Sequence, residues 1–467
     1  MTSIKRMTST VLAITMLVTV LAGCKSNSIN EDEQNHLPES TLSENTEKTV
    51  LTLATFDIEN IRNRVAFFNN SNSNYYIEII DYNENRGIEV YDPNEVGSGF
   101  DYYSGLTRLN TEIIAGNVPD LLDLSFLPYY QYASSGLLED IYPFIDSDPE
   151  FNRSDLIEGA FRASEIDGKL YQLFPTFGIN TIAGHPSVLG SGMGWSLNEL
   201  RDVLAFHPNA DMPIGRGYTA TKTEFLREII THNIEEYIDW GNSSVSFDTD
   251  NFVAVLEFVN ETFPAEPIMG DDSNTSDILF ATGRQIMEVM TIYDLRNYQY
   301  HKAMFGGDIV FKGFPGKNEG SHSIRGVAGI GITSVAKDKV GAWQFLRSLL
   351  DVDYQLSFYN GFPTNRTAFD VYIQKWVTES NESNEVITDP INGEVLFELQ
   401  PISQEDINNF MILIDSLSVT TARTTLDNAF WNVLFECADD FFSGRNTSQD
   451  AARIMQNRVE KYVSERG

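Results

Sequence analysis

Cysteine is nearly absent from this chain, which has two cysteines, Cys24 and Cys437, in 467 residues. A framework of disulfides is therefore excluded, and a stable fold must rest on a large apolar core instead. Cys437 lies in a helix predicted over residues 430–442, where we expect it to be a small buried apolar residue. Long apolar runs are also lacking after the first 23 residues, so we expect the rest of the chain to be soluble.

Basic residues are scarce as well, since 32 Lys and Arg stand against 67 Asp and Glu, a formal charge of −35. No basic stripe offsets this charge, so we expect no binding to nucleic acid. Anionic ligands are disfavoured unless a local basic pocket holds them. The length exceeds that of one compact core and predicts two lobes.

Motifs for catalysis and for metal binding are missing. The six histidines have no metal-ligand spacing, and the chain has neither a G-x-S-x-G nucleophile elbow nor a P-loop. The glycine-rich residues 190–194 do not open a helix after a strand, so they are interpreted as a flexible loop. Carboxylates are too abundant for a glycosidase pair to stand out. We therefore expect no catalytic residue, no metal and no cofactor.

One segment has some features of a calcium loop. Oxygen donors alternate along the chain from Asp81, but Arg86 stands where such a loop needs glycine and Asp92 where it needs glutamate. A polar turn after a strand is the alternative interpretation, and both remain open at this point.

The N-terminus has the layout of an export signal. Lys5 and Arg6 precede an apolar run over residues 11–20, and small residues then lead to Cys24. This pattern is typical of a secretory signal peptide and is too short for a spanning helix. Residues 21–24 (LAGC) resemble the lipobox of bacterial lipoproteins.

The lipobox resemblance implies that residues 1–23 are removed and that the thiol of Cys24 carries lipid at the mature N-terminus. An ordinary secreted protein with a chance cysteine is the alternative. Loss of the two bases of the signal leaves 30 Lys and Arg against 67 acidic residues, a formal charge of −37. Residues 24–48 are polar and acidic, which predicts a disordered tether with a reach of roughly 25–30 Å.

Strands and helices alternate after the tether. Strands are predicted over residues 50–55, 75–82 and 120–125, and helices over residues 57–69 and 103–115. This order indicates a doubly wound α/β fold.

The remaining chain continues the same mixture and contains no internal repeat. Helices are predicted over residues 197–206, 222–239, 249–262, 274–282, 339–350, 405–416, 428–442 and 448–464. Strands are predicted over residues 285–291 and 327–332, and a surface loop or short hairpin over residues 378–392.

Several further stretches share one ordered pattern. They are residues 115–121 (AGNVPDL), 136–141 (GLLEDI), 166–175 (IDGKLYQLFP), 280–287 (FATGRQIM), 337–346 (KDKVGAWQFL), 428–431 (NAFW) and 443–445 (SGR). As a set they resemble segments of the extracellular solute-binding proteins of carbohydrate ABC importers, of the maltose-binding type. The resemblance covers residues 49–465 and follows the lipobox, as it does in that family.

The resemblance implies a two-lobed α/β fold of the type II periplasmic-binding-protein class, in which the chain crosses between the lobes three times. The crossings are expected near residues 175–178, 313–315 and 356–364. The N-terminal lobe would comprise residues 49–176 and 314–356, and the C-terminal lobe residues 177–313 and 357–467. Ligand would bind between the lobes at the carboxyl ends of the strands, and hinge closure would bury it.

A sugar site is the further implication. Aromatic rings cover the apolar faces of a pyranose, and polar side chains satisfy its hydroxyls. The ligand-binding residues that the resemblance implies are Tyr293, Trp431, Asp57, Ser125, Phe126, Phe177, His232 and Trp240. Core packing is the alternative for several of these aromatic residues. The maltose-binding type carries charged residues where this chain has Leu127 and Pro128, which argues against a maltose-like ligand.

The sequence therefore predicts a monomeric, membrane-tethered binding protein on the extracellular or periplasmic side, and not an enzyme. It would capture a sugar or oligosaccharide and deliver it to the transmembrane subunits of an ABC permease. The alternatives are a carbohydrate-active lipoprotein enzyme, a binding protein for a cationic or peptide ligand, and a ligand sensor.

Overall fold

The structure is a computed structural model that describes residues 48–83, 102–215, 221–240, 242–266, 276–316, 322–357, 361–382, 385–420 and 428–464. The predicted export signal, Cys24 and nearly all of the tether lie outside the described residues. Most of the calcium-like segment that starts at Asp81 lies outside them too.

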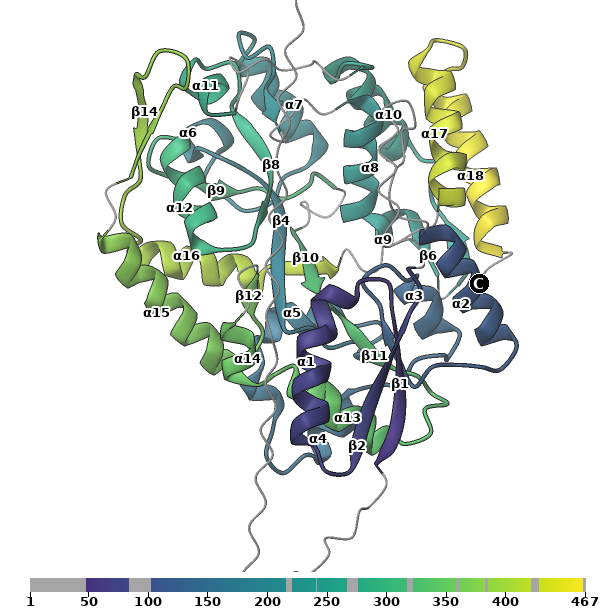
Figure 1. Cartoon of the computed structure of the whole chain (residues 1–467). Helices are drawn as coiled ribbons and strands as arrows, with labels where there is room; N and C mark the ends of the chain where they lie inside the picture. The colour runs from purple at the N-terminus through teal and green to yellow at the C-terminus, as the bar shows by residue number, and fades with distance from the viewer. Residues whose placement is uncertain are drawn as a thin grey trace, which may run out of the picture. The chain divides into compact units, whose positions relative to one another are not determined.

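The N-terminal lobe is built on a sheet of strand order β11-β3-β1-β2 (Figure 1). Its strands are β1 (Thr49–Thr55), β2 (Tyr75–Asp81), β3 (Leu121–Asp123) and β11 (Ile330–Ile332). β1 runs parallel to β2 and β3, whereas β11 is antiparallel to β3. The helices of this lobe are α1 (Ile58–Ser71), α2 (Tyr102–Ile114), α3 (Tyr129–Ser134), α4 (Tyr142–Ser147), α5 (Glu158–Arg162) and α13 (Lys339–Ser348), with a 3₁₀ turn at Arg153–Asp155.

Helix α1 shows why the sequence folds in this way locally. Ile61, Val65 and Phe68 recur at helical spacing and are all buried on the sheet side. The Phe68 ring meets Phe345 of α13 edge to face, with ring centroids 5.3 Å apart. Burying each such side chain contributes about 1.5–3 kcal/mol, so this stripe fixes α1 on the sheet.

The C-terminal lobe is built on a sheet of order β15-β10-β4-β8-β5, with β9 and β12 also paired to β4. Its strands are β4 (Thr176–Gly184), β5 (Ile214–Gly215), β8 (Met287–Ile292), β9 (Val310–Phe311), β10 (His322–Val327), β12 (Phe362–Pro363) and β15 (Leu417–Thr420). Two separate pairs complete the strands, β6 (Ile238–Asp239) with β7 (Ser244–Val245), and β13 (Val386–Thr388) with β14 (Val395–Glu398).

Helices cover both faces of this second sheet. They are α6 (Pro186–Leu189), α7 (Leu197–Phe206), α8 (Lys222–His232), α9 (Ile234–Tyr237), α10 (Asp250–Thr262), α11 (Ser276–Ala281), α12 (Leu295–Met304), α15 (Arg366–Glu382), α16 (Gln404–Asp415), α17 (Asn428–Phe442) and α18 (Ser448–Ser464). Helix α14 (Val352–Leu356) follows α13 and lies before the last crossing between the lobes. Side chains of β4 alternate between the two faces, since Ile182 belongs to the apolar cluster with α8, α10, α17 and α18. Ile179 belongs to the cluster with α12, α15 and α16.

The chain passes between the two sheets three times. Leu173 still pairs with Ile330 of β11, and β4 then begins at Thr176 in the second sheet. The chain returns between the end of β10 at Val327 and the start of β11. It crosses again between α14 and β12, which pairs with β4. The two-lobed α/β fold and its crossings near residues 175–178 and 356–364 are as the sequence predicts.

The predicted crossing at residues 313–315 is wrong, and so is the lobe limit placed there. The N–H of Gly313 bonds to the carbonyl of Ile182 at 3.3 Å, and Phe314 is fully buried in the C-terminal lobe. Gly313 and Pro315 follow β9 and end that strand, but the chain stays within the C-terminal lobe at this point. The crossing follows β10 instead, so the strand predicted over residues 327–332 is divided between the two sheets.

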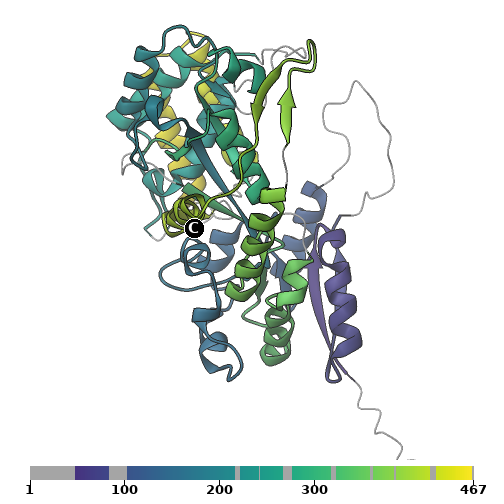
Figure 2. The same cartoon turned by 90° about the vertical axis from the view of Figure 1, so that its left-hand side faces the viewer.

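Most other predicted elements are found within a few residues of their expected limits. The helix predicted over residues 222–239 is interrupted after His232, where the side chain of Asn233 donates to the carbonyl of Ile229 at 3.0 Å. Of the loop or short hairpin predicted over residues 378–392, the hairpin is found, but it begins later, because α15 continues to Glu382 and β13 and β14 follow it. Figure 2 shows this hairpin at the edge of the C-terminal lobe.

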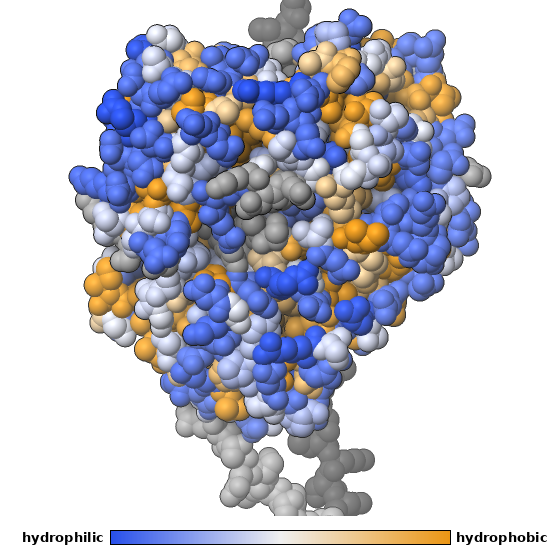
Figure 3. Space-filling view, turned by 180° about the vertical axis from the view of Figure 1, so that it is seen from behind, coloured by the Kyte–Doolittle hydropathy of each residue, from blue (hydrophilic) through white to orange (hydrophobic). Residues whose placement is uncertain are grey.

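Three features of the described residues can be compared with the composition: the length of apolar helices, the burial of Cys437 and the polarity of the surface. None of the helices in the described ranges is long and apolar enough to cross a membrane. Cys437 is buried in α17, as expected from its helical surroundings. The face of the molecule in Figure 3 is mainly hydrophilic, with its hydrophobic residues in separate patches.

Candidate functional site

Polar side chains gather where the parallel strands of the N-terminal sheet end. The carboxyl ends of β1, β2 and β3 lie at one edge because these strands run in the same direction. Asp123 is buried at this edge and accepts hydrogen bonds from Thr55 Oγ1 at 2.8 Å and from Ser125 Oγ at 2.7 Å. Burial raises the pKa of Asp123, and the charge of nearby Asp57 raises it further.

Three of the predicted ligand-binding residues lie at this edge. Asp57 is half-buried at the start of α1, and its N–H donates to Thr55 Oγ1 at 3.0 Å. The hydroxyl of Ser125 is bonded to Asp123. Phe126 is 41 % exposed, so it is the member of this group with a large accessible apolar surface.

Asn83 lies at the same edge, although the sequence did not predict it as a ligand-binding residue. It follows β2, and its Nδ2 donates to the carbonyl of Phe56 at 3.3 Å. Its Oδ1 is buried and has no hydrogen-bond partner within the described part of the chain. A buried acceptor of this kind is uncommon in folded proteins and can be satisfied by a hydroxyl of a ligand or by water.

A row of polar side chains crosses the C-terminal sheet close to the crossings. Asn180 accepts from Thr291 Oγ1 at 2.7 Å and donates to Ser323 Oγ at 3.3 Å. Ser323 Oγ lies 2.7 Å from His232 Nδ1, and His232 Nε2 lies 2.9 Å from Glu228 Oε2. The row therefore ties β4, β8 and β10 to helix α8.

This row contains the residue types of a serine-hydrolase triad without its accessibility. Ser323 has 0 % exposure and His232 has 3 %. The imidazole of His232 also stacks on the Phe314 ring with centroids 3.7 Å apart. A triad needs a serine oxygen that a substrate can reach, so these residues stabilise the lobe rather than perform catalysis. As placed, His232 is a core residue and presents no surface to a ligand.

Tyr293 lies at the crossings. It follows β8 directly and is half-buried. Its phenol oxygen accepts a hydrogen bond from Arg325 Nη1 at 3.2 Å, and its ring lies against Gly178 of β4. Arg325 was not predicted as a site residue, because Tyr293, which it contacts, is distant from it in the sequence.

Trp240 is in contact with the opposite lobe. Its ring centroid lies 5.5 Å from that of Tyr130 on α3. Next to Tyr130, the side chain of Gln131 bonds to Tyr462 of α18. The two lobes thus meet through aromatic and polar side chains at a place separate from the three crossings. The tyrosine-rich segment around Tyr130 could have indicated a binding surface, but its contact with Trp240 is seen only in the folded structure.

Two of the predicted ligand-binding aromatics are core residues. Phe177 has 0 % exposure and packs on Phe362, with centroids 5.8 Å apart. Trp431 is 6 % exposed and stacks on Phe435 at 5.4 Å, while the guanidinium of Arg227 lies 5.0 Å from its ring. For both residues the structure agrees with core packing, which was the alternative to ligand binding.

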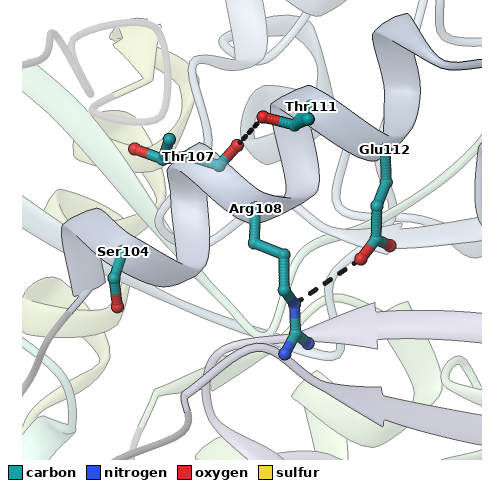
Figure 4. Close-up of a pocket in the computed structure, with 5 residues that line it drawn as sticks. All are labelled: Ser104, Thr107, Arg108, Thr111 and Glu112. Atoms are coloured by element: carbon teal, nitrogen blue, oxygen red, sulfur yellow. Dashed lines mark hydrogen bonds and ion pairs between the residues drawn. The ribbon is translucent and has the colours of Figure 1, made fainter.

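Two surface cavities were not predicted, and neither includes a predicted ligand-binding residue. One of about 630 Å³ lies along α2 and is lined by Ser104, Thr107, Arg108, Thr111 and Glu112 (Figure 4). The other, of about 520 Å³, lies between α1 and α14 and is lined by Asn63, Arg64, Phe67, Asp351, Val352, Asp353, Tyr354 and Ser357. The residues described contain no group of three His, Cys, Asp or Glu side chains placed to hold a metal ion.

The topology and the crossings define the class of fold. A sheet with the order β2-β1-β3-β11 and an antiparallel β11, joined to a second α/β lobe by three crossings, is that of the type II two-lobed solute-binding proteins. No protein-family model matches the chain, and no curated protein matches it in sequence.

Solved structures are similar to the chain in fold. The sugar-binding protein MalE of the phytopathogen Xanthomonas citri aligns with a TM-score of 0.55 at 14 % identity, over 90 % of this chain and 98 % of that one. An extracellular solute-binding protein of family 1 from Alicyclobacillus acidocaldarius aligns with a TM-score of 0.50 at 15 % identity, over 90 % and 99 % of the two chains. At these identities the likeness shows the two-lobed fold alone.

Proposed function

We propose that this chain is a membrane-tethered, extracellular solute-binding protein that captures a sugar or oligosaccharide between its lobes and delivers it to an ABC permease. The observation that carries the proposal is the type II two-lobed topology with side chains of both lobes meeting away from the hinge. The similar structure from Xanthomonas citri is that of a sugar-binding protein, which supports the same ligand class.

The chemistry at the lobe edges suits a saccharide. Phe126 supplies an exposed ring, and Tyr130 with Trp240 supplies rings on opposite lobes. Such rings cover the apolar faces of a pyranose. Asp57 and Asn83 supply oxygen acceptors for its hydroxyls at the edge of the N-terminal sheet. The proposal therefore places the ligand between this edge and the segment around Trp240.

The cellular location in the proposal rests on the N-terminal sequence. The lipobox-like residues 21–24 would place lipid on Cys24, and residues 25–48 would hold the folded lobes away from the membrane. A single lipid chain binds membranes weakly, which fits a diacylglyceryl anchor with two chains. We propose that the protein acts as a monomer and is not an enzyme.

A thermal-shift screen tests the ligand class. The purified protein without residues 1–23 is heated with mono- and oligosaccharides, with short peptides and with polyamines. A ligand that binds the folded state raises the melting temperature by mass action, by an amount set by its concentration relative to Kd. We expect a rise with at least one saccharide and none with polyamines or peptides.

Two outcomes would contradict the proposal. A rise with polyamines or peptides and with no saccharide would overturn the ligand class. Release of cleavage products from an oligosaccharide during incubation would overturn the statement that the protein is a binder without turnover.

A further inference from the structure

Tyr293 contacts all three segments through which the chain passes between the lobes. Its ring lies on Gly178, in the strand that follows the first crossing. Its phenol oxygen accepts from Arg325, in the strand that leads into the second crossing. Its backbone carbonyl accepts from the N–H of Gly361 at 3.0 Å, at the end of the third crossing.

The contact with Gly178 depends on the missing side chain. A Cβ at this position would lie 2.7 Å from both Cδ1 and Cε1 of the Tyr293 ring, closer than such atoms come in real proteins. One face of the ring is therefore covered by the backbone of β4. Only the other face of the ring is therefore available to stack on a sugar, the role that the sequence predicted for Tyr293.

The other two contacts hold segments that lead into or follow β10 and β12, and each of these strands pairs with β4. Arg325 is exposed, it faces Gly178 across the β10–β4 pair, and Nη1 donates to the phenol oxygen at 3.2 Å. Gly361 has a φ of +101°, and a Cβ there would lie 2.8 Å from Thr176. Only glycine fits this backbone conformation comfortably, so its N–H can reach the carbonyl of Tyr293.

We propose that Tyr293 is a positioning residue that ties the three crossings into one hinge. Lobe closure is a rotation about these crossings, in which a few backbone angles change. Separate segments would change their angles independently, whereas segments bonded to one side chain and one carbonyl move together. Tyr293 thereby narrows the range of lobe separations that the protein samples. The test requires no ligand, so its outcome is independent of the proposed function.

Hydrogen exchange of the ligand-free protein, read by mass spectrometry, tests the proposal. Tyr293→Ala removes the ring and the phenol, and with them the packing that holds the carbonyl of residue 293 in place. It should therefore speed exchange about tenfold in peptides that cover residues 176–180, 322–327 and 361–365, the factor expected when a local contact is loosened. Tyr293→Phe keeps the ring, and both variants keep the backbone carbonyl, so Tyr293→Phe should speed exchange only over residues 322–327. Small-angle X-ray scattering should report a broader distribution of lobe separations for Tyr293→Ala and rescue by Tyr293→Phe.

Two further variants keep the test decisive. Gly178→Ala displaces the ring from the other side and should reproduce the exchange pattern of Tyr293→Ala even if that variant does not fold. Tyr75→Phe is the matched control, because it removes a phenol hydrogen bond to Asp338 that is also 3.2 Å long but lies within one lobe. It should leave all three peptides unchanged. Exchange in Tyr293→Ala and Gly178→Ala that is altered only next to the substituted residue, with an unchanged scattering profile, would overturn the proposal.

Discussion

Two tryptophans illustrate what decides the role of a single residue here. Trp240 and Trp431 were both predicted to bind ligand, yet Trp240 meets Tyr130 of the other lobe and Trp431 is enclosed by its own helix bundle. An aromatic residue can serve either purpose, and its sequence neighbourhood does not distinguish them. The same holds for His232, whose buried bonds with Ser323 and Glu228 assign it to the core.

Substitution of these residues should separate affinity from stability. Trp240→Ala and Tyr130→Ala should each weaken binding of a saccharide that the protein binds by roughly tenfold to a hundredfold, because each removes a ring at the proposed site. Trp431→Ala should instead lower the free energy of unfolding by about 3–5 kcal/mol, as large-to-small core changes do. Isothermal titration calorimetry and urea denaturation measure the two effects. Equal affinity in Trp240→Ala and wild type would remove Trp240 from the site.

A second residue-scale prediction concerns His322. Burial lowers its pKa to about 4, and its Nδ1 lies 2.9 Å from Thr181 Oγ1. In the unfolded chain the imidazole takes up a proton near pH 6.5, whereas in the folded protein it stays neutral down to about pH 4. The unfolded state therefore binds more protons in this window, and stability falls as the pH is lowered through it.

The loss attributable to His322 between pH 6.5 and pH 4 should be about 3 kcal/mol, from the size of the pKa shift. Chemical denaturation across this range should show a shallower pH dependence for His322→Gln than for wild type. His207→Gln, a change at a half-buried histidine outside the sheet, is measured alongside it as the control for the loss of one histidine. Parallel slopes for His322→Gln and wild type would contradict the assignment.

At the scale of elements, packing contacts decide where helices and strands sit. Helix α2 approaches β2 so closely that a Cβ on Gly105 would lie 2.1 Å from the carbonyl oxygen of Tyr82. The apolar spacing of residues 103–115 predicted the helix, but not this approach. Likewise the strand expected over residues 327–332 is shared between two sheets, because β10 and β11 pair with different partners.

Gly105→Ala tests the docking of α2. In an exposed helix alanine is more favourable than glycine by about 0.5–1 kcal/mol, but here the added carbon has no space. We expect a net destabilisation of about 1–3 kcal/mol from overpacking, measured by urea denaturation. Gly192→Ala is the matched control, since no heavy atom lies within 4 Å of its added Cβ. A Gly105→Ala protein as stable as wild type would show that α2 can shift freely on the sheet.

At the scale of the whole molecule, an apolar core continues through the crossings. Phe174 and Phe177 belong to one cluster with Leu53 of the N-terminal sheet and Phe410 of α16. The crossings are therefore packed into a core that both lobes share. Tyr293 lies on the face of β4 opposite to Phe177 and this apolar cluster.

The attachment of the molecule to its membrane is tested at Cys24. Cys24→Ala removes the only thiol in the lipobox-like segment, so the protein should shift from the membrane fraction to a released or uncleaved form. Cell fractionation followed by mass analysis of the N-terminus measures this. Cys437→Ala is the control and should leave the distribution unchanged, because that thiol is buried in α17. Unaltered membrane retention of Cys24→Ala would exclude lipidation as the anchor.

The amino-acid sequence by itself determined the order of elements, the α/β class, the two lobes and two of the three crossings. Apolar periodicity and turn residues are local signals, and they place α1, α7, α10, α17 and α18 within about a turn of their observed limits. The placement of Asp57, Ser125 and Phe126 at one sheet edge also follows from strands that run parallel.

Only the tertiary structure decided the second crossing and the surroundings of the candidate site residues. Strand pairing and burial depend on contacts between residues far apart in the chain, as when Gly313 bonds to Ile182 or Trp240 meets Tyr130. The three contacts of Tyr293 are of the same kind, since Gly178, Arg325 and Gly361 come together only after β8, β10 and β12 have paired with β4 in the C-terminal sheet. No local pattern encodes such meetings, because their free energy arises from the packed fold rather than from any one segment.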